Sequence, residues 1–313
     1  MISIAADLGG TNIKIALIQD RSILMQRSLP ALSGNGLKPR LPVLKEAVNY
    51  MLAEYDFQPS QLQGMGIAFP GLVDVKSKTV ISTNQKYDDA LQVDLPAWVQ
   101  NNWQLPLQID NDARMALRGE WQFGAGKGLD NLVMITLGTG VGGATLIEGK
   151  ILYGKHFQAG CLGGHLTINM SGRKCTCGNI GCVEAEAAGW SLPDVIKSYA
   201  GYSKSELSKT DVPDFKLLFQ LVRTGDQVAS EVLKHCLQVW GAGIISMIHA
   251  YDPEMVIVSG GIMQSGDLII PALQQKVDQL AWTPWGRVEV KQAHYLNEAA
   301  LLGAHYMVQH LNN

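Results

Sequence analysis

Two stretches that end in glycine-rich turns constrain the fold of this chain more than any other feature. Residues 2–13, ISIAADLGGTNI, and residues 133–143, VMITLGTGVGG, each run from apolar, β-prone residues into a glycine-rich bend. A second apolar run follows each bend, KIALI in the first case and ATLI in the second. We therefore predict two β-hairpins whose tips expose backbone N–H groups and a threonine hydroxyl. Because glycine lets the main chain approach a phosphate closely, two such tips predict two related halves that bind one polyphosphate.

Two familiar nucleotide-binding motifs do not fit these glycines. Gly138, Gly140 and Gly143 satisfy G-x-G-x-x-G, but the dinucleotide fingerprint requires a helix after the glycines, and a strand pattern follows here. The P-loop sequence G-x-x-x-x-G-K-[ST] does not occur. Two ordinary tight hairpins without a ligand are the remaining alternative. The pairing of Asp7 with Thr11 and the repetition of the device favour phosphate binding over that alternative.

Length and composition indicate a globular protein of two domains. The chain has 313 residues, of which 47% are hydrophobic and 17% charged, and one compact core rarely extends over so long a chain. A net charge of −3 without a basic run predicts no nucleic-acid partner. No apolar run approaches membrane-spanning length, and Asp7 interrupts the first apolar stretch where a signal peptide would need an unbroken one. We therefore expect a cytoplasmic protein without a membrane partner.

Short strand and helix patterns alternate along the chain, which predicts an α/β fold. Strands are expected in a meander at residues 2–29 and at 65–69, 105–109, 255–259 and 288–291. Helices are expected at residues 41–55, 95–103, 113–121, 192–198, 216–223, 230–251, 267–279 and 299–310. Residues 203–214 are expected to form a polar loop. Trp282 and Trp285 are expected to be exposed, where they mark either an interface or ordinary packing.

Asp110, Asn111 and Asp112 lie between a predicted strand and a predicted helix. Asn111 or Asp112 is therefore expected at the N-cap of that helix, which is the usual role of these residue types. The carboxyl end of a strand is also where α/β proteins bind ligands, and a doubled carboxylate exceeds what a cap needs. Asp112 is therefore a candidate functional residue.

His165, Cys175, Cys177 and Cys182 form the pattern H-x9-C-x-C-x4-C within turn-prone sequence. Three thiolates and an imidazole suit a tetrahedral zinc ion, and four protein ligands leave no open position for catalysis. We therefore predict a structural zinc site that holds a loop without a core of its own. Cys161 lies close enough in the sequence to compete with His165 as the fourth ligand.

Five motifs together resemble the ROK family of sugar kinases and sugar-responsive repressors. They are DLGGTNIK at residues 7–14, DNDAR at 110–114, TLGTGVGG at 136–143, GH followed by CTCGNIGCVE at 175–184, and SGGI at 259–262. The resemblance implies an actin-like, hexokinase-type (ribonuclease H-like) fold with two α/β domains, a cleft between them and a homodimer. ROK repressors carry an added N-terminal helix-turn-helix. This chain begins with the first glycine hairpin and is similar to the kinase branch.

The resemblance also implies domain boundaries and a role for each matching residue. Residues 1–112 with 301–313 would form a smaller domain, and 113–300 a larger one that contains the zinc loop. The residues expected at the phosphates of ATP and at Mg²⁺ are Asp7, Gly9, Gly10, Thr11 and Lys14. The second set expected at phosphates is Thr136, Gly138, Thr139, Gly140 and Gly142, with Gly260 and Gly261 against adenosine. The sugar pocket would contain Gly71, Asn84, Asn111, Asp112, His165 and Glu184, with Asp112 as general base.

One position departs from the family pattern. The family usually has G-E-[IL]-G-H, in which the glutamate binds sugar hydroxyls, whereas this chain has GCLGGH at residues 160–165. Leu162 stands three residues before His165, and Cys161 is the nearest match to the glutamate, one residue out of register. A site built to bond a hydroxyl loses heavily when that partner is missing. The departure predicts an altered sugar or weak activity and leaves the identity of the sugar open.

The leading hypothesis is ATP-dependent phosphorylation of a monosaccharide, at the C6 hydroxyl of a hexose or N-acetylhexosamine, with Asp112 as general base. The alternative is a sugar-sensing regulatory protein without catalysis on the same scaffold, which the missing glutamate favours and the two glycine turns oppose. An actin-like ATPase or chaperone is a third possibility, but such a protein has no evident use for Asn111, Asp112 and the zinc loop. The expected cofactors are ATP, Mg²⁺ and a structural Zn²⁺.

Overall fold

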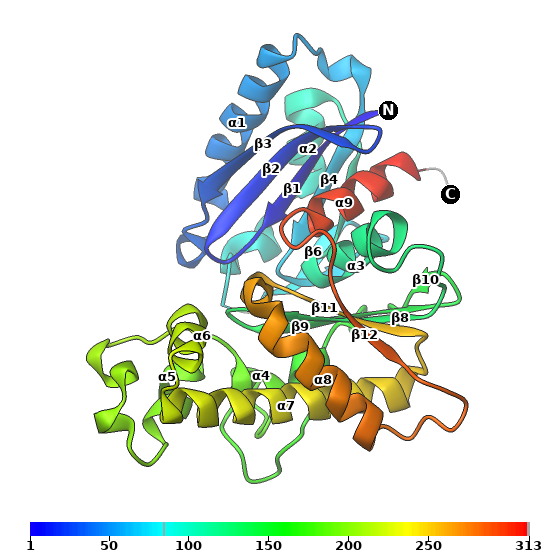
Figure 1. Cartoon of the computed structure of the whole chain (residues 1–313). Helices are drawn as coiled ribbons and strands as arrows, with labels where there is room; N and C mark the ends of the chain where they lie inside the picture. Colours follow the sequence, from blue (N-terminus) through cyan, green and yellow to red (C-terminus); the bar gives the residue numbers. More distant parts are fainter. Residues whose placement is uncertain (84, 312–313) are drawn as a thin grey trace. The chain divides into compact units, whose positions relative to one another are not determined.

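The computed structural model describes residues 1–83 and 85–311 of the chain (Figure 1). Internal contacts divide the chain into two compact units. Unit 1 comprises Met1–Gly128, Tyr153–Ala159 and Asn297–Asn313, and unit 2 comprises Leu129–Leu152 and Gly160–Leu296. The domain boundaries implied by the family resemblance stay a prediction. None of the helices in the described part of the chain combines the length and apolar character needed to cross a lipid bilayer.

Unit 1 is built on a five-stranded mixed sheet with the strand order β3-β2-β1-β4-β7. Antiparallel pairing joins β1, β2 and β3, and parallel pairing joins β1 to β4 and β4 to β7. The strands are β1 (Ile2–Leu8), β2 (Asn12–Gln19), β3 (Ser22–Pro30), β4 (Leu62–Phe69) and β7 (Leu107–Asn111). A separate hairpin pairs β5 (Gly71–Asp74) with β6 (Thr79–Thr83).

Helices cover both faces of this sheet (Figure 1). They are α1 (Leu41–Glu54), α2 (Leu95–Trp103), α3 (Asp112–Phe123) and α9 (Ala299–Gln309). Side chains of β1 alternate between the faces, as the pleat requires. Ile4 packs in the cluster that contains Leu44 of α1 and Val99 of α2, whereas its neighbour Ser3 bonds His305 of α9.

Unit 2 has a sheet with the order β10-β9-β8-β11-β12, in which β8, β9 and β10 pair antiparallel and β11 joins β8 and β12 in parallel. Its strands are β8 (Leu132–Leu137), β9 (Val141–Ile147), β10 (Lys150–Ile151), β11 (Met255–Ser259) and β12 (Glu289–Gln292). Its helices are α4 (Val183–Ala187), α5 (Leu192–Lys197), α6 (Phe215–Arg223), α7 (Gln227–Tyr251) and α8 (Gly266–Leu280). Figure 1 shows α7 and α8 on the same side of this sheet.

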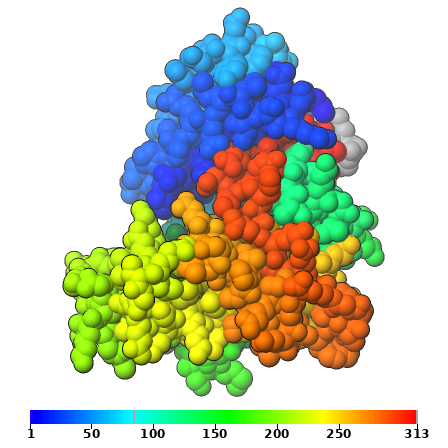
Figure 2. All heavy atoms as spheres, viewed as in Figure 1, coloured from blue at the N-terminus to red at the C-terminus, as the bar shows by residue number. Residues whose placement is uncertain are grey.

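The connection from α8 to β12 forms part of the surface of unit 2 (orange in Figure 2). It carries Trp282 and Trp285, whose exposed fractions are 79% and 57%. The expectation that both tryptophans are exposed is therefore confirmed. Two large apolar side chains exposed three residues apart in one connection are candidates for contact with another molecule.

The two sheets repeat one topology, a meander followed by two parallel strands, so the expectation of two related halves and of an α/β fold is confirmed. Strand β9 follows the second glycine turn directly, which confirms that a strand stands where a dinucleotide fingerprint needs a helix. Among the strands and α-helices of the described residues, four were not predicted from the sequence: β5 and β6, which pair as a hairpin, β10 and α4. The prediction of a polar loop at residues 203–214 is also wrong in detail, because 3-10 helices occupy Tyr202–Lys204 and Glu206–Lys209.

Candidate active site and metal centre

The first glycine turn joins β1 to β2 in unit 1. Asp7 and Lys14 lie directly opposite each other in the register of these strands. Gly9 and Gly10 are partly buried at the tip, and Thr11 is exposed. A Cβ atom on Gly9 would lie 2.6 Å from the carbonyl oxygen of Asn12, so the tight bend leaves no room for a side chain there. The predicted hairpin is therefore present, with a small exposed tip between an aspartate and a lysine.

Asn111 and Asp112 share the start of α3. Asn111 is the N-cap, and its side-chain oxygen accepts hydrogen bonds from the backbone N–H groups of Ala113 at 3.1 Å and Arg114 at 3.3 Å. The Nδ2 atom of Asn111 donates to Asp112 Oδ1 at 3.0 Å and to the Gly71 carbonyl at 3.1 Å. Asn111 is therefore the residue that caps α3, so the Asp112 carboxylate is not needed as the cap.

The Asp112 carboxylate is held by one of its two oxygens. Oδ1 accepts from the N–H of Ala113 at 2.8 Å as well as from Asn111. Oδ2 accepts no hydrogen bond from another residue in the described ranges 1–83 and 85–311. Burial raises the pKa of Asp112, and the charge of Lys86 is the largest opposing effect. An oriented carboxylate with one open oxygen is the geometry that a general base needs.

Asp110 does not join Asp112, although the two stand two positions apart in the chain. It lies in β7, and its carboxylate accepts a hydrogen bond from the Tyr153 hydroxyl at 2.7 Å. Arg114 and Arg118 approach the same carboxylate at 3.7 Å each. These contacts tie the segment Tyr153–Ala159 to α3 and give Asp110 a structural role. Of the two carboxylates in the DND sequence, Asp110 therefore lies in a buried cluster of ionic contacts, and Asp112 lies at the start of α3.

The charge of Asp112 acts on the Asp7 carboxylate. Burial first and the charge of Asp112 second raise the pKa of Asp7 to about 7, and the charge of Lys14 acts in the opposite direction. A carboxylate whose charge is disfavoured by burial and by a second carboxylate is suited to bind a divalent cation, because Mg²⁺ prefers oxygen ligands. The first turn therefore combines an exposed Thr11 with an aspartate suited to a cation.

The second glycine turn joins β8 to β9 in unit 2. The hydroxyl of Thr136 accepts a hydrogen bond from the N–H of Gly142 at 3.1 Å, and the N–H of Gly138 donates to the Gly140 carbonyl at 3.0 Å. Thr139 is exposed at the tip. The carbonyls of Gly138 and Thr139 accept hydrogen bonds from the N–H groups of the two residues at 189–190. The segment after α4 therefore supports this turn.

Glu184 in α4 is buried, and its carboxylate is bonded to the second turn. Oε2 accepts from the backbone N–H of Val141 at 2.8 Å, and the same atom would lie 2.6 Å from a Cβ on Gly140. The structure therefore brings Glu184 to the glycine turn of unit 2. Its expected place in the sugar pocket stays a prediction.

Three of the remaining predicted residues lie beside strand ends. Gly260 follows β11 with a φ of 106°, and a Cβ there would lie 2.1 Å from the Leu137 carbonyl, so a non-glycine residue does not fit. Gly261 begins the 3-10 helix Gly261–Ser265 and is exposed. Gly71 opens β5 and contacts Asn111 through its carbonyl. Asn84, the last of the predicted set, lies outside the described residues.

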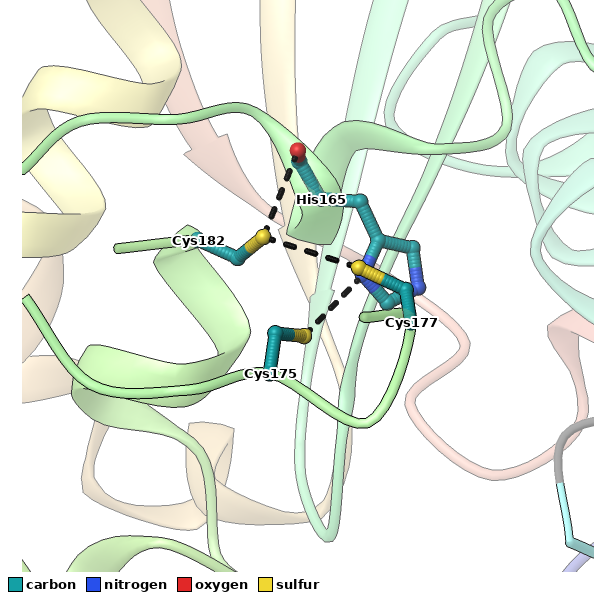
Figure 3. A group of neighbouring side chains, drawn as sticks. All are labelled: His165, Cys175, Cys177 and Cys182. Atoms are coloured by element: carbon teal, nitrogen blue, oxygen red, sulfur yellow. Dashed lines mark hydrogen bonds between the residues drawn. The ribbon is translucent and has the colours of Figure 1, made fainter. Parts of the chain in front are cut away.

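His165, Cys175, Cys177 and Cys182 form a group that can hold a metal ion (Figure 3). Their ligand atoms all lie within 4.8 Å of one another. Sγ of Cys175 is 3.5 Å from Nδ1 of His165, and the sulfurs of Cys177 and Cys182 are 3.8 Å apart. A tetrahedral zinc ion with its usual bond lengths separates two sulfur ligands by about 3.8 Å and a sulfur from a nitrogen by about 3.5 Å. The donor set and its spacing therefore fit zinc.

The rival ligand Cys161 is not part of this group, although it is buried. Between Cys161 and His165, Gly163 and Gly164 start the 3-10 helix that carries the histidine. A Cβ on Gly164 would lie 1.9 Å from the carbonyl of Val141, so this turn packs directly on β9. The segment GCLGGH at residues 160–165 therefore places His165 beside the three cysteines.

Lys86 and Tyr87 belong to the site but were not predicted from the sequence. Tyr87 is fully buried, and its hydroxyl donates to the Gly9 carbonyl at 2.9 Å. A Cβ on Gly10 would lie 3.3 Å from Nζ of Lys86. A single lysine in a polar loop carries no sequence signal of such a contact, because it comes from a distant part of the chain.

The fold and the site define a class, namely an α/β protein with a duplicated sheet, two glycine turns, a carboxylate at a helix start and a Cys/His cluster. The ROK family model matches residues 3–311, and the chain belongs to the ROK family. It is similar to the glucokinase of Thermotoga maritima, with 30% identity over 311 residues that cover 96% of this chain and 95% of the relative.

Solved structures and a repressor show the same likeness. The ROK family glucokinase from Streptomyces griseus, in complex with glucose and AMPPNP, superposes with a TM-score of 0.83 at 27% identity, covering 99% of each chain. The chain is also similar to the xylose repressor of Bacillus subtilis, with 26% identity over 91% of this chain and 70% of the repressor. The matches to ROK glucokinases confirm the predicted actin-like, hexokinase-type fold.

Proposed function

We propose that this chain is an ATP-dependent sugar kinase, a phosphotransferase that phosphorylates a hydroxyl of a monosaccharide. The observation that carries the proposal is the Asp112 carboxylate, oriented through Oδ1 and open at Oδ2, in the same unit as the first glycine turn. The glucokinase relatives support the kinase class, and the glucokinase bound to glucose and AMPPNP supports sugar and ATP as ligands. The acceptor that we propose is the C6 hydroxyl of a hexose or an N-acetylhexosamine.

The chain's own residues supply positioning and proton transfer. Asp112 accepts the proton of the attacking hydroxyl through Oδ2, while the Asn111 amide holds Oδ1. The turn at Gly9–Thr11 in unit 1 and the turn at Thr139–Gly140 in unit 2 each offer backbone N–H groups to phosphate oxygens of the nucleotide, with residues 260–261 at the adenosine. Bound ATP supplies the phosphoryl group. This work is mainly positioning and charge neutralisation, which suits the small catalytic set.

Two metal ions belong to the proposal. Asp7 fits Mg²⁺ because its carboxylate is disfavoured by burial and by Asp112, a cost that a divalent cation removes. The group of His165, Cys175, Cys177 and Cys182 fits a structural Zn²⁺ by donor type and spacing. With four protein ligands, that ion would stabilise the loop before α4.

A homodimer and a cytoplasmic location, where ATP is available, are part of the same proposal. The exposed Trp282 and Trp285 support an interface, because their apolar surface would be removed from water by a second copy of the chain. Size-exclusion chromatography with light scattering tests the dimer, and a monomer at micromolar concentration would contradict it.

The alternative function is sugar sensing without catalysis. The absence of the family glutamate from residues 160–165 and the similarity to a xylose repressor favour it. The oriented Asp112 and both glycine turns favour the kinase, since a sensor needs neither. Nucleotide affinity separates the two functions, because a sugar sensor without kinase activity does not need to bind ATP.

The test is ADP release with Mg·ATP over a panel of hexoses, N-acetylhexosamines and pentoses, with Asp112→Asn beside the wild type. We expect turnover on one sugar that falls about 10²- to 10⁴-fold in the variant, the range for loss of a general base, with sugar affinity retained. Unchanged turnover in Asp112→Asn would remove Asp112 from the role. No turnover on any sugar, together with no ATP binding, would favour the sensor.

A further inference from the structure

The segment after β6 brings a lysine side chain over the first glycine turn. Cε of Lys86 lies 2.9 Å, and Nζ 3.3 Å, from the position that a Cβ atom on Gly10 would occupy. A side chain at residue 10 would therefore collide with the lysine. The absence of one lets the partly buried Lys86 lie against the backbone of the turn.

Hydrogen bonds of its neighbours hold this lysine in place. Tyr87 donates its hydroxyl hydrogen to the Gly9 carbonyl at 2.9 Å and its backbone N–H to the Ser33 carbonyl at 2.8 Å. Ser33 in turn donates to the Gly10 carbonyl at 2.9 Å. Gln85 and Tyr87 both have left-handed backbones, with φ of 56° and 57°, which non-glycine residues adopt only where the surroundings require it. These contacts hold the backbone beside Lys86 at the first turn, within unit 1.

The ammonium of Lys86 can donate hydrogen bonds to a ligand. Lys14, the other lysine near the turn, donates to the Asn297 carbonyl at 3.0 Å and to Asn297 Oδ1 at 3.2 Å. Nζ of Lys86, by contrast, donates no hydrogen bond to any residue in the described part of the chain. Its charge acts on Asp112, where it lowers the pKa against the effect of burial. An ammonium has three donors and favours anionic oxygen acceptors.

We propose that Lys86 is a catalytic residue whose ammonium binds an oxygen of the γ-phosphoryl group, between the Gly10 turn and Asp112. The inference rests on the proposed kinase function. In the transfer, a bond forms from the sugar oxygen to the γ-phosphorus, and the bond from that phosphorus to the β,γ-bridging oxygen breaks. The hydroxyl proton passes to Asp112, and ADP leaves with the bonding electrons. Lys86 keeps its proton and offsets negative charge on the phosphoryl oxygens throughout.

Nucleotide binding without sugar tests this role directly. Calorimetry with Mg·AMPPNP and with Mg·ADP compares a nucleotide that has a γ-phosphoryl group with one that lacks it. We expect Lys86→Met to weaken AMPPNP binding about tenfold or more, the effect of losing one charged hydrogen bond, and to change ADP binding less than about twofold. Lys86→Arg, which keeps the charge, should recover most of the AMPPNP affinity.

The matched control is Lys38→Met. Lys38 is exposed, and its ammonium bonds the Gln92 side chain at 3.3 Å, so removal of this charge should change neither nucleotide affinity. The melting temperature of every variant shows whether the fold is retained.

Two outcomes would overturn the assignment of Lys86: unchanged AMPPNP affinity in Lys86→Met, or equal weakening of AMPPNP and ADP binding. Unchanged AMPPNP affinity together with a displaced acid limb of the pH–rate profile would make Lys86 a positioning residue that acts only through Asp112. The wild type separates the two proposals. If it binds neither nucleotide, the kinase function itself fails, whereas normal wild-type binding with an unaffected Lys86→Met removes the lysine alone.

Discussion

The charge of Asp112 at the start of α3 acts on the Asp7 carboxylate near the end of β1, within unit 1. Burial and then the charge of Asp112 raise the pKa of Asp7 to about 7, despite the nearby Lys14. Such a pair costs folding free energy whenever both groups are charged. The site that we propose for phosphoryl transfer is therefore a source of instability in the ligand-free protein.

Replacement of Asp7 by Asn should stabilise the ligand-free protein at alkaline pH. The folded pKa of about 7 lies above the ordinary value of 3.8, so the folded chain holds more protons than the unfolded chain between these values. Stability therefore falls as the pH rises through this window. We expect a higher melting temperature for Asp7→Asn than for the wild type near pH 8, by about 2–4 °C for each kcal/mol of folding free energy gained. This difference in melting temperature should narrow toward about pH 4. The control is Asp211→Asn, in an exposed loop; an equally large difference for this variant would contradict the prediction.

His305 should make stability fall in acid. Its Nδ1 is 2.7 Å from the Ser3 hydroxyl and its Nε2 is 2.6 Å from the Asp20 carbonyl, so a neutral ring with the proton on Nε2 satisfies both. Burial lowers the pKa of His305 from 6.5. Between that lowered value and about 6.5 the unfolded chain binds more protons, so stability is complete above this window and declines as the pH falls through it.

Thermal unfolding at several pH values from about 5 to 8 measures the effect of His305. The control is His305→Gln, which lacks the titrating group. The melting temperature of the wild type should fall more steeply below about pH 6.5 than that of the variant. Parallel curves would show that His305 does not titrate differently in the folded and unfolded states.

Gly303→Ala should disrupt the packing of α9. A Cβ at this position would lie 1.8 Å from the carbonyl oxygen of Met115 in α3. The gain of about 1 kcal/mol in helix propensity is smaller than the cost of forcing two helices apart, which is about 1–3 kcal/mol or more. Gly34→Ala is the matched control because no atom lies within 4 Å of its Cβ position. Chemical denaturation should show a loss of stability in the first variant only; an equal response of both would contradict the close helix contact.

Metal analysis should identify the fourth ligand of the Cys/His group. We expect about one zinc per chain in the wild type and in Cys161→Ser, and loss of the metal with a lower melting temperature in Cys177→Ser and His165→Ala. Arg173 and buried Glu186 bond each other at 2.9 Å and hold the loop onto α4 independently of the metal. The variants are therefore expected to loosen the loop while the rest of unit 2 stays folded. Zinc retained in His165→Ala and lost in Cys161→Ser would reverse the assignment.

Local patterns account for what could be predicted from the sequence. The glycine turns follow from residue types within one hairpin, and the helix at residues 95–103 follows from its spacing and from the cap that Asp94 provides. The Cys/His group is largely local as well, since its three cysteines lie within eight residues. The β5–β6 hairpin was missed because its strands are short and half exposed, and so lack a clear alternation of apolar residues.

Contacts between distant parts of the chain account for the features of the site that could not be predicted. The sequence does not distinguish the carboxylates at 110 and 112. In the structure, Tyr153 and two arginines contact Asp110 and do not contact Asp112. Lys86 reaches the first turn only because Tyr87 and Ser33 bond the same turn. These pairings depend on tertiary structure, which no short sequence pattern encodes. The individual roles of the predicted site residues stay predictions until the variants above are measured.

The division of the chain between the units has a consequence for the order of folding. The chain passes between the units after Gly128, Leu152, Ala159 and Leu296, so α9, which packs on β1 and β4, follows the whole of unit 2 in the chain. A chain cut after Leu296 lacks the helix that covers the β1 face carrying Ser3, while unit 2 keeps all of its strands. Unit 2 can therefore fold without α9, whereas unit 1 is completed only when α9 joins it. A chain truncated after residue 296 should thus be protected from protease in unit 2 and cleaved in unit 1.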